Sequence, residues 1–462
     1  MTGKGRGAMT GERPRVIVVG GGLAGMAAAL ACTDGGTEVT LLEGRKWLGG
    51  ATASFDRDGL RIDTGQHVFL RCCTSYRAFL GRLGVTGKTE LQRRMDIPVL
   101  SPRRGLTRLR RGGFPAPLHL APALARYPLL HPAERLRAVG ASLALRRLDP
   151  LDPAVDSQSF GAWLAGRGQS ERAVRYLWDL FGLPALNLPA SEASLALAAK
   201  VFRTGLLERA DAADIGVPLV PLAELHGEPA TAALAAAGAE VHRGARVRTI
   251  EVGADGVVGA RLDDLAVQGD AVILAVPNDR VGEVLPSGAL TDPLAPERLG
   301  SSPIVNVHVV YDRPVTAFRF AAAVDSPVQW VFDRSGPAGL ERGQYLAISL
   351  SGARSWVDRP VERFRDAFLP ALAELFPAAR SAVVERFLVT RERTATFRQA
   401  PGTAALRAGP QTLIPRLFLA GSWTDTGWPA TMESAVRSGL AAARRALLAV
   451  GRTERLPAEV AA

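Results

Sequence analysis

Near its start the chain alternates short apolar runs with glycine-rich breaks. Residues 15–19 read Arg-Val-Ile-Val-Val, a mostly β-branched run that predicts a buried strand of a parallel sheet. Glycines follow at once, then an alanine-rich helical stretch around residues 26–30, then a second apolar run at 39–42. This order predicts a strand–turn–helix–strand unit, which is typical of an α/β domain.

The remaining apolar patterns divide the chain into segments of different kinds. Residues 81–212 show helical periodicity and no strand-rich stretch, residues 213–285 return to mixed strands and helices, and residues 286–395 alternate as strands do. Helices are expected at 132–147, 191–209, 229–237, 361–375 and from about 431 to 448. Strands are expected at 239–242, 247–252, 257–262, 271–277, 304–311, 328–332, 345–350 and 417–421.

The first glycine-rich break carries the spacing of a dinucleotide-binding turn. Gly20, Gly22 and Gly25 form GxGxxG between the first strand and the first helix. The first glycine permits a tight turn, the second lets the backbone approach a pyrophosphate, and the third allows close packing of helix on strand. Glu43 follows 18 residues after Gly25 and ends the second strand. A carboxylate there accepts hydrogen bonds from the ribose of an unphosphorylated adenosine, as in FAD or NAD.

Two further segments favour FAD over a nicotinamide cofactor. Gly49 and Gly50 follow the acidic strand closely, and this second glycine pair lets the backbone close around an extended cofactor. At the other end of the chain, the strand at 417–421 leads into a loop and a helix. Backbone N–H groups near Met432, at the start of that helix, would stabilise the negative edge of a reduced flavin. Together the two ends predict one bound FAD.

These motifs resemble those of the FAD-dependent amine oxidase and phytoene desaturase superfamily. The resemblance rests on residues 18–25, Glu43, the two paired glycines, the sequence Asp-Thr-Gly-Gln-His at 63–67 and the segment 419–439. Within the superfamily, the blocks at 63–67, 186–189 and 421–439 are most similar to the hydroxysqualene dehydroxylase branch. The resemblance assigns to FAD the residues Gly20, Gly22, Leu23, Ala24, Gly25, Glu43, Arg45, Gly49, Gly50, Ala51, Gly65, Gln66, Val247, Gly421, Asp425 and Met432.

Two positions depart from the family pattern. Members often carry Arg after the paired glycines, where this chain has Ala51, and many carry an acid after the glycine of the last strand, where this chain has Ser422. Arg45 or Lys46 is expected to supply the missing positive charge, and Asp425 the missing acid.

The resemblance also implies an α/β fold in which a discontinuous, Rossmann-like FAD-binding domain carries an inserted α+β substrate domain. The FAD-binding domain is expected to comprise residues 14–80, 213–285 and 396–450, and the substrate domain residues 81–212 and 286–395. Residues 1–13 contain four glycines and few apolar residues, and are expected to form a disordered tail.

By resemblance, the expected reaction is reductive removal of the allylic hydroxyl of hydroxysqualene, giving squalene for hopanoid synthesis. His67 is the candidate proton donor to the leaving hydroxyl, and the alternative is a hydrogen-bonded structural histidine beside the flavin. The chain has one GxGxxG, so a transiently docking nicotinamide, a redox partner or a quinone has to exchange electrons with the flavin. A carotenoid desaturase and a non-catalytic escort protein for prenyl lipids remain alternatives. An amine oxidase is less favoured, because five tyrosines offer little for an aromatic amine cage.

Charge and cysteine content narrow the class of partner. The net charge is +11, but only four of the 56 basic residues are Lys, a bias that coding preference explains. Basic residues gather between Arg82 and Arg111 without the interleaved aromatic rings that stack on bases, so we expect no nucleic-acid partner. Three cysteines without a CxxC pair exclude a disulfide framework and a cysteine metal site, which indicates a reduced, cytoplasmic enzyme.

One segment suggests contact with a membrane. Residues 114–130 are apolar, interrupted by prolines and flanked by Arg108, Arg110, Arg111 and Arg126. Apolar anchors ringed by arginines suit peripheral contact with the inner face of a membrane, from which a lipophilic isoprenoid substrate could be taken, and a helical lid over the pocket fits equally well. No stretch approaches 18 uncharged apolar residues, so we expect no transmembrane helix.

Overall fold

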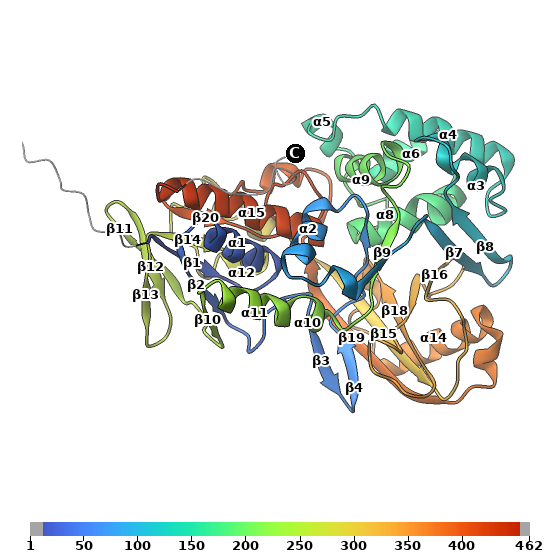
Figure 1. The fold of residues 1–462 in the computed structure, drawn as a ribbon. Coiled ribbons are helices and arrows are strands. Elements are labelled where there is room, and N and C mark those ends of the chain that lie inside the picture. Colours follow the sequence, from blue (N-terminus) through green and yellow to red (C-terminus); the bar gives the residue numbers. More distant parts are fainter. Residues whose placement is uncertain (1–12, 453–462) are drawn as a thin grey trace, which may run out of the picture.

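The computed structural model describes residues 13–452 and is built around two main sheets (Figure 1). The predicted tail lies outside the described residues except for residue 13. The first sheet is parallel throughout, in the order β10-β2-β1-β14-β20. Its strands, taken from distant parts of the chain, are β1 (Arg15–Val19), β2 (Glu38–Glu43), β10 (Glu240–Arg243), β14 (Ala271–Leu274) and β20 (Leu417–Leu419).

Small residues let helices pack closely on the first sheet. α1 (Leu23–Asp34) is buried from Leu23 to Cys32, as a helix that is apolar on all sides should be. It lies against α15 (Met432–Ala449) and α11 (Gly227–Ala236). A Cβ atom at Gly439 of α15 would lie 2.1 Å from the Ala24 carbonyl oxygen, so α1 and α15 could not approach this closely with any other residue there.

The second sheet has seven strands in the order β19-β15-β18-β17-β16-β7-β8. One face packs on α14 (Val361–Leu375) through an apolar cluster that includes Val305, Val307 and Phe364. The other face carries polar and aromatic side chains and is described with the site below. The strands are β7 (Asp96–Ser101), β8 (Gly105–Arg110), β15 (Ser302–Tyr311), β16 (Phe320–Ala323), β17 (Trp330–Asp333), β18 (Gln344–Leu350) and β19 (Val384–Thr396).

The expectation that residues 81–212 lack strands was wrong. β6 (Thr89–Leu91), β7 and β8 lie in this segment, and β7 and β8 extend the second sheet. β7 is buried along most of its length and β8 is mostly exposed, so neither shows the alternation of a half-buried strand. β7 and β8 pair with each other as a local hairpin, and Val99 of β7 also pairs with Ala322 of β16, far along the chain, which buries β7 within the sheet.

The expected helices and the other expected strands are confirmed, with shifts at their ends. Helices α3 to α9 form a separate group, at the upper right in Figure 1. The remaining helices are α2 (Thr74–Arg82), α3 (Ala121–Ala125), α4 (Pro132–Leu145), α5 (Pro153–Asp156), α6 (Phe160–Gly166), α7 (Glu171–Ala173), α8 (Asp179–Leu186), α9 (Leu195–Phe202), α10 (Leu222–Leu225), α12 (Asn278–Val281) and α13 (Ala295–Arg298). The smaller sheets contain β3 (Ser54–Arg57) and β4 (Leu60–Asp63); β5 (Phe69–Leu70), β9 (Ile215–Pro218) and β6; and β11 (Thr249–Gly253), β12 (Gly256–Arg261) and β13 (Ala266–Gln268).

Candidate functional site

The turn between β1 and α1 is closely packed at two of its glycines. Gly20 has a φ of +105°, and a Cβ atom there would lie 2.4 Å from the carbonyl oxygen of Ala275, just after β14. A Cβ atom at Gly25 would lie 1.8 Å from the carbonyl oxygen of Gly20. No side chain fits at either position, so both glycines are required for α1 to begin this close to the sheet.

At Gly22, by contrast, the same turn is open. A Cβ atom there would meet nothing nearer than the Cα atom of Gly50, at 4.0 Å. The first turn of α1, which begins with Leu23 and Ala24, has no side-chain cap and no acidic residue. Its N–H groups and the positive end of the helix dipole are therefore available to an anion beside Gly22.

The predicted acid, the arginine and both glycine loops meet at the carboxyl ends of β1 and β2. The Glu43 carboxylate accepts hydrogen bonds from the backbone N–H groups of Gly21, at 2.6 Å, and Arg45, at 2.7 Å. The Arg45 guanidinium donates to the carbonyl oxygen of Gly50, at 3.2 Å. The N–H of Gly49 donates to the carbonyl oxygen of Gly21, at 2.8 Å. Ligands of open parallel sheets bind at this edge of the sheet.

Val247 lies close to the same acid. The backbone N–H of Ala245 donates to the carbonyl oxygen of Glu43, at 2.8 Å, and that of Gly244 donates to the carbonyl oxygen of Arg45, at 2.8 Å. Val247 follows two residues later and is buried. Val247, which the resemblance assigns to FAD, is therefore on the same side of the site as Glu43, the residue predicted to bind the ribose.

A second chain of contacts leads from the paired glycines to the second sheet. The carbonyl oxygen of Ala51 accepts a hydrogen bond from the Thr64 hydroxyl, at 2.6 Å, and the carbonyl oxygen of Thr64 lies 3.5 Å from Nδ2 of Asn306 in β15. Gly65, which is buried, and Gln66, which is half-buried, follow Thr64. The buried atoms Nε2 of Gln66 and Oδ1 of Asn306 have no hydrogen-bond partner among the described residues. Unpaired buried amide atoms are costly, so one such donor and one such acceptor in this place indicate a ligand.

The start of α15 follows the loop after β20. Thr431 is the N-cap residue, and its hydroxyl accepts a hydrogen bond from the N–H of Ser434, at 3.3 Å. Met432 is the first helical residue. Gly421 follows β20, and its N–H donates to the hydroxyl of Ser438, at 2.8 Å, which ties the last strand to this helix.

Asp425, the expected replacement for the missing acid, is at the surface. Its side chain is exposed and accepts a hydrogen bond from the N–H of Gly427, at 3.1 Å. No described contact joins it to the glycine turns, so its role toward a cofactor stays a prediction.

His67 lies beside a buried ion pair. Its Nδ1 atom is 3.1 Å from the carbonyl oxygen of Gly65. Burial lowers the pKa of His67, the Gly65 carbonyl and Asp63 oppose that shift, and Arg334 adds to it. Asp63 itself pairs with Arg334, at 2.6 Å, and also accepts from the Ser54 hydroxyl and a backbone N–H, so it organises the loop. The neutral imidazole is therefore the favoured form of His67, and it is a weak acid at neutral pH.

Comparisons with known proteins agree with this geometry. The sequence model of the family described as flavin containing amine oxidoreductase matches residues 23–447. The chain belongs to this family. It is 33% identical over 448 residues to a hydroxysqualene dehydroxylase of Rhodopseudomonas palustris, covering 95% of this chain and 99% of the relative. It is 25% identical to a 15-cis-phytoene desaturase of Glycine max, over 92% of this chain and 78% of the relative. Cyclohexylamine oxidase from Brevibacterium oxydans has the same fold, with a TM-score of 0.70 at 20% identity over 94% of this chain and 99% of the oxidase.

This member of the flavin-containing amine oxidoreductases is an FAD-dependent oxidoreductase, and the residues present fit FAD. The turn is open at Gly22, the helix N-terminus beside it is uncapped, and Glu43, the residue predicted to bind the ribose, contacts the N–H of Gly21. The guanidinium of Arg45 reaches Gly50, so a positive charge lies at the paired glycines although Ala51 replaces the usual arginine. The contacts that individual residues make with FAD stay predictions.

In this family member, the face of the second sheet opposite α14 carries a row of paired residues. The row extends away from the residues predicted to bind FAD. Asn306 of β15 pairs with Ser349 of β18, which pairs with Trp330 of β17, which pairs with Ala322 of β16. Residues directly opposite one another on neighbouring antiparallel strands point to the same face. Because strands are about 4.8 Å apart, Trp330 stands about 10 Å from Asn306.

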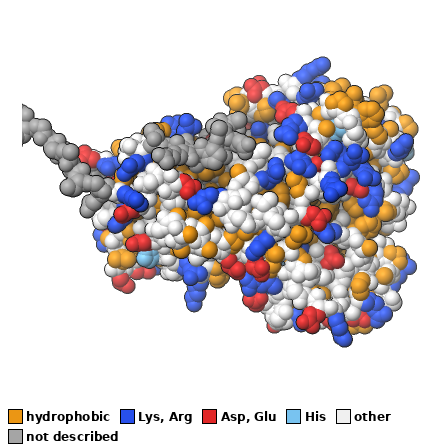
Figure 2. All heavy atoms as spheres, viewed as in Figure 1, with side chains coloured by type: hydrophobic (Ala, Val, Ile, Leu, Met, Phe, Trp, Pro, Cys, Tyr) orange, Lys and Arg blue, Asp and Glu red, His pale blue; other side chains and the backbone are white. Residues whose placement is uncertain are grey.

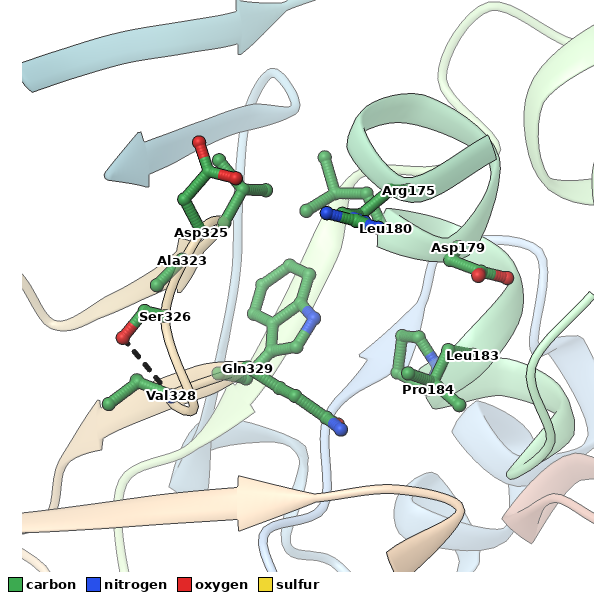
Figure 3. Close-up of a pocket in the computed structure, with 12 residues that line it drawn as sticks. Arg175, Asp179, Leu180, Leu183, Pro184, Ala323, Asp325, Ser326, Val328 and Gln329 are labelled. Carbon is green, nitrogen blue, oxygen red and sulfur yellow. Dashed lines mark hydrogen bonds between the residues drawn. The ribbon is translucent and has the colours of Figure 1, made fainter. Parts of the chain in front are cut away.

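A cavity of about 380 Å³ adjoins the Trp330 end of this row (Figure 3). It lies between α8 with the preceding π-helical turn, Val174–Trp178, and the hairpin that joins β16 to β17. Broad apolar walls with a few polar groups are typical of sites for small molecules. The lining residues are Arg175, Asp179, Leu180, Leu183, Pro184, Ala323, Val324, Asp325, Ser326, Val328, Gln329 and Trp330.

Asn306, Trp330 and Asp179 were not predicted from the sequence. Asn306 interrupts a run of β-branched residues in a predicted strand, and that signal could have found it. Trp330 and Asp179 have no comparable local signal, because the cavity arises where a helix meets a hairpin that is distant in sequence.

Proposed function

We propose that this oxidoreductase removes the allylic hydroxyl of hydroxysqualene by reduction and gives squalene, for hopanoid or related triterpenoid synthesis. The observation that carries the proposal is the similarity, over nearly the whole of both chains, to proteins named hydroxysqualene dehydroxylase. The apolar cavity beside the polar row of the second sheet supports it, because a long isoprenoid with one hydroxyl needs both kinds of surface.

The proposed reaction needs a proton for the leaving hydroxyl, a hydride for the carbon and protection from water. Reduced FAD, when bound, supplies the hydride. Loss of water leaves an allylic cation, and apolar walls such as Leu180, Leu183 and Val328 keep solvent from it. His67 is one candidate for the proton donor, although its lowered pKa makes it a poor one.

The deciding experiment bypasses the unknown electron donor. The purified protein is incubated without oxygen with chemically reduced FAD and hydroxysqualene, and the extracted lipid is analysed by mass spectrometry. We expect squalene in proportion to the FAD that becomes oxidised. Unchanged hydroxysqualene with FAD still bound would exclude this reaction.

A carotenoid desaturase is the second candidate, favoured by the similarity to plant 15-cis-phytoene desaturases. Such an enzyme would convert a C–C single bond to a double bond by removing a hydride from one carbon and a proton from the next, and would need oxidised FAD as the hydride acceptor. Incubation of the protein with phytoene, oxidised FAD and a quinone acceptor tests this function directly. New conjugated double bonds, read from the absorption spectrum, would support it.

We also propose that the end of the molecule near α3 and α4 docks on an anionic membrane surface. Leu136, Val139 and Leu143 form an apolar stripe on α4 and are 75%, 41% and 44% exposed. Phe114 and Leu118, in the segment before α3, are also exposed. Hydrophobic and basic side chains gather at this end in Figure 2, and the exposed arginines there include Arg110, Arg126, Arg137, Arg146 and Arg147. Apolar anchors ringed by cations suit insertion among anionic headgroups.

Between residues 13 and 452, no helix is both long and apolar enough to cross a membrane. Peripheral docking is tested by co-sedimentation with vesicles of phosphatidylcholine alone or with phosphatidylglycerol. The double variant Leu136→Glu/Leu143→Glu should lose binding to the anionic vesicles and keep its FAD. Leu294→Glu, at another exposed leucine, is the matched control. Equal binding by the double variant would contradict docking through α4.

A further inference from the structure

A second cavity, of about 420 Å³, shares no lining residue with the cavity in Figure 3 and carries positive charge. Its walls come from the start of α2, from α9 and the π-helical turn after it, Arg203–Leu207, and from the first turns of α15 with the loop before them. Short π-helical turns are frequent at functional sites. Three lining residues are cations, Lys200, Arg209 and Arg437, and Glu208 is the one lining anion.

The exposed charges at the rim of this cavity are paired. Glu208 forms an ion pair with Arg203, at 3.1 Å, and Arg209 forms one with Asp211, at 3.2 Å. Arg203 and Asp211 do not line the cavity. The single carboxylate of the wall is therefore neutralised by an arginine outside it, and the cavity keeps an excess of positive charge.

Two of the cations lie over one aromatic ring. The Nζ atom of Lys200 is 4.9 Å from the ring centroid of Trp428, and the guanidinium carbon of Arg437 is 5.0 Å from the same centroid. Arg437 is also held by the buried Glu433 carboxylate, at 2.7 Å. Trp428 thus brings two like charges to one wall of the cavity, where the ring attracts both.

Lys200, unlike the other two cations, has no carboxylate partner. Among residues 13–452, its ammonium forms no ion pair and no hydrogen bond, and the Trp428 ring is its described contact. Burial and then the charge of Arg437 lower the pKa of Lys200, and Glu208 opposes this shift. A half-buried cation beside a second cation costs free energy, which a bound anion would recover.

Hydroxyl groups of the same cavity are also available to a ligand. The Thr204 hydroxyl, in the π-helical turn, has no hydrogen-bond partner among the described residues. The Thr74 hydroxyl accepts a hydrogen bond from the Arg437 guanidinium, at 3.3 Å, and still has its own proton to donate. The cavity therefore combines an unpaired cation with hydroxyl donors.

We propose that this cavity binds the phosphate group of a small organic molecule, with Lys200 as its main charged contact. The proposal is independent of the reaction proposed above. The cations and hydroxyls offer more donors than a carboxylate accepts, and a phosphate ester presents three strongly accepting oxygens. Sites for small organic ligands have volumes of about 300–1,000 Å³, so this cavity has room for the group that carries the phosphate.

The cavity is near the residues predicted to hold the flavin. Trp428 precedes Met432 by four residues, and four extended residues span at most about 14 Å. Two kinds of organic phosphate suit this position. One is a nicotinamide nucleotide, which would approach the flavin with its ring, and the other is a prenyl diphosphate, which shares its chain type with an isoprenoid substrate. Both present the same phosphate chemistry to Lys200.

The first test measures binding to the holoprotein, saturated with FAD so that the cofactor's own phosphate site is filled. Isothermal titration with inorganic diphosphate gives the affinity for the phosphate chemistry alone. Lys200→Met removes the charge and keeps an unbranched side chain, and we expect the affinity to fall about tenfold or more. Absence of binding to the unaltered protein, or equal binding by Lys200→Met, would overturn the proposal.

Two variants control for charge and for folding. Lys200→Arg restores a positive charge and should regain most of the affinity, which damage to the fold would not allow. Lys88→Met, at an exposed lysine whose ammonium donates to a backbone carbonyl oxygen, should bind diphosphate as the unaltered protein does. An equal loss in Lys88→Met would mean that net charge alone attracts the anion and would overturn the site.

Cys72 reports whether the anion lies in this cavity. Its thiol lines the cavity, whereas Cys32 is fully buried. Diphosphate should slow the alkylation of Cys72 by iodoacetamide, followed by peptide mass spectrometry, and this protection should be lost in Lys200→Met. Binding by titration without protection of Cys72 would place the anion elsewhere and contradict the proposal.

Two further ligands separate the sources of the phosphate. NADP⁺ and farnesyl diphosphate are titrated in the same way, with FAD oxidised. Tighter binding of NADP⁺ than of inorganic diphosphate, lost in Lys200→Met, would support a nucleotide site, and the same result with farnesyl diphosphate would support a prenyl diphosphate site. If neither binds more tightly than inorganic diphosphate, the cavity takes the free anion only, and an organic phosphate is the wrong ligand.

Discussion

The glycine turn predicted to bind FAD and the polar face of the second sheet hold their candidate binding groups in opposite ways. Around Gly22 the groups are backbone N–H atoms, exposed because side chains are missing, and they come from residues close together in sequence. On the second sheet they are the side chains of Asn306 and Trp330, on separate strands. A site made from backbone shows itself as a glycine motif, whereas a site made from distant side chains depends on how the elements meet.

The largest effect is expected at Gly25, where the glycine turn leaves no space for a side chain. Gly25→Val places side-chain atoms where a Cβ is already 1.8 Å from the carbonyl oxygen of Gly20, so α1 cannot begin at the turn. We expect loss of bound FAD and of all activity, measured by flavin absorbance of the purified protein. Gly282→Ala, where a Cβ meets nothing within 4 Å, is the control. Normal FAD content in Gly25→Val would refute the tight packing of this turn.

The second largest effect is expected at the ion pair between the second sheet and the end of β4. Arg334, just after β17, pairs with Asp63 at the end of β4, and both side chains are less than 10% exposed. Arg334→Met leaves the Asp63 carboxylate buried and unpaired, which should lower the free energy of unfolding by about 3–5 kcal/mol in urea denaturation. Arg393→Met breaks an exposed pair with Asp358 and should have a much smaller effect. Equal stability of the two variants would show that the buried ion pair contributes no more to the free energy of unfolding than the exposed one.

A third prediction concerns how the stability of the second sheet depends on pH. His308 of β15 is buried, with its ring nitrogens 2.7 Å from the Tyr345 hydroxyl and 3.0 Å from the Thr390 hydroxyl, and burial lowers its pKa to about 3. The unfolded chain binds a proton near pH 6.5, so this contribution to stability is complete above that pH and is lost as the pH falls toward 3. The loss from pH 7 to pH 5 should be about 2 kcal/mol.

His308→Gln should remove that part of the pH dependence in unfolding curves recorded at pH 7 and pH 5. His242→Gln, at a half-exposed histidine of β10, should leave it unchanged. If the His308 variant keeps the full slope, its imidazole is not the group that titrates.

The smallest effect is expected at Asn306, where stability and FAD affinity should change in different directions. Asn306→Leu removes a buried amide whose Oδ1 atom has no partner among the described residues. The apoprotein should be as stable as before or slightly more so, while FAD binding should weaken about fivefold to tenfold, near 1 kcal/mol. Isothermal titration and melting of the apoprotein measure both. Ser349→Ala, at the neighbouring position of the row, is the control. A destabilised apoprotein with unchanged FAD affinity would mean that Asn306 is structural.

Much of the first sheet could be predicted because each signal is local. The run before Gly20, the glycine spacing and the acid at Glu43 belong to one continuous segment, and the helix from Met432 follows its N-cap residue directly. β7 and β8 pair with each other as a hairpin and were missed because neither alternates: β7 is mostly buried, through its pairing with distant β16, and β8 is mostly exposed. Asp179 was missed because an aspartate in a helical segment is ordinarily exposed to solvent.

The sequence by itself determined the α/β unit at the start of the chain, its family and its cofactor, because backbone turns that accept phosphate require glycine at set positions. Only the tertiary structure decided which polar groups are buried without partners, and so which can act on a ligand. Burial shifts the pKa of His67 down and that of Asp179 up, and neither environment can be read from neighbouring residues. Desolvation depends on what packs around a group in space, so proton chemistry here is a property of the folded chain.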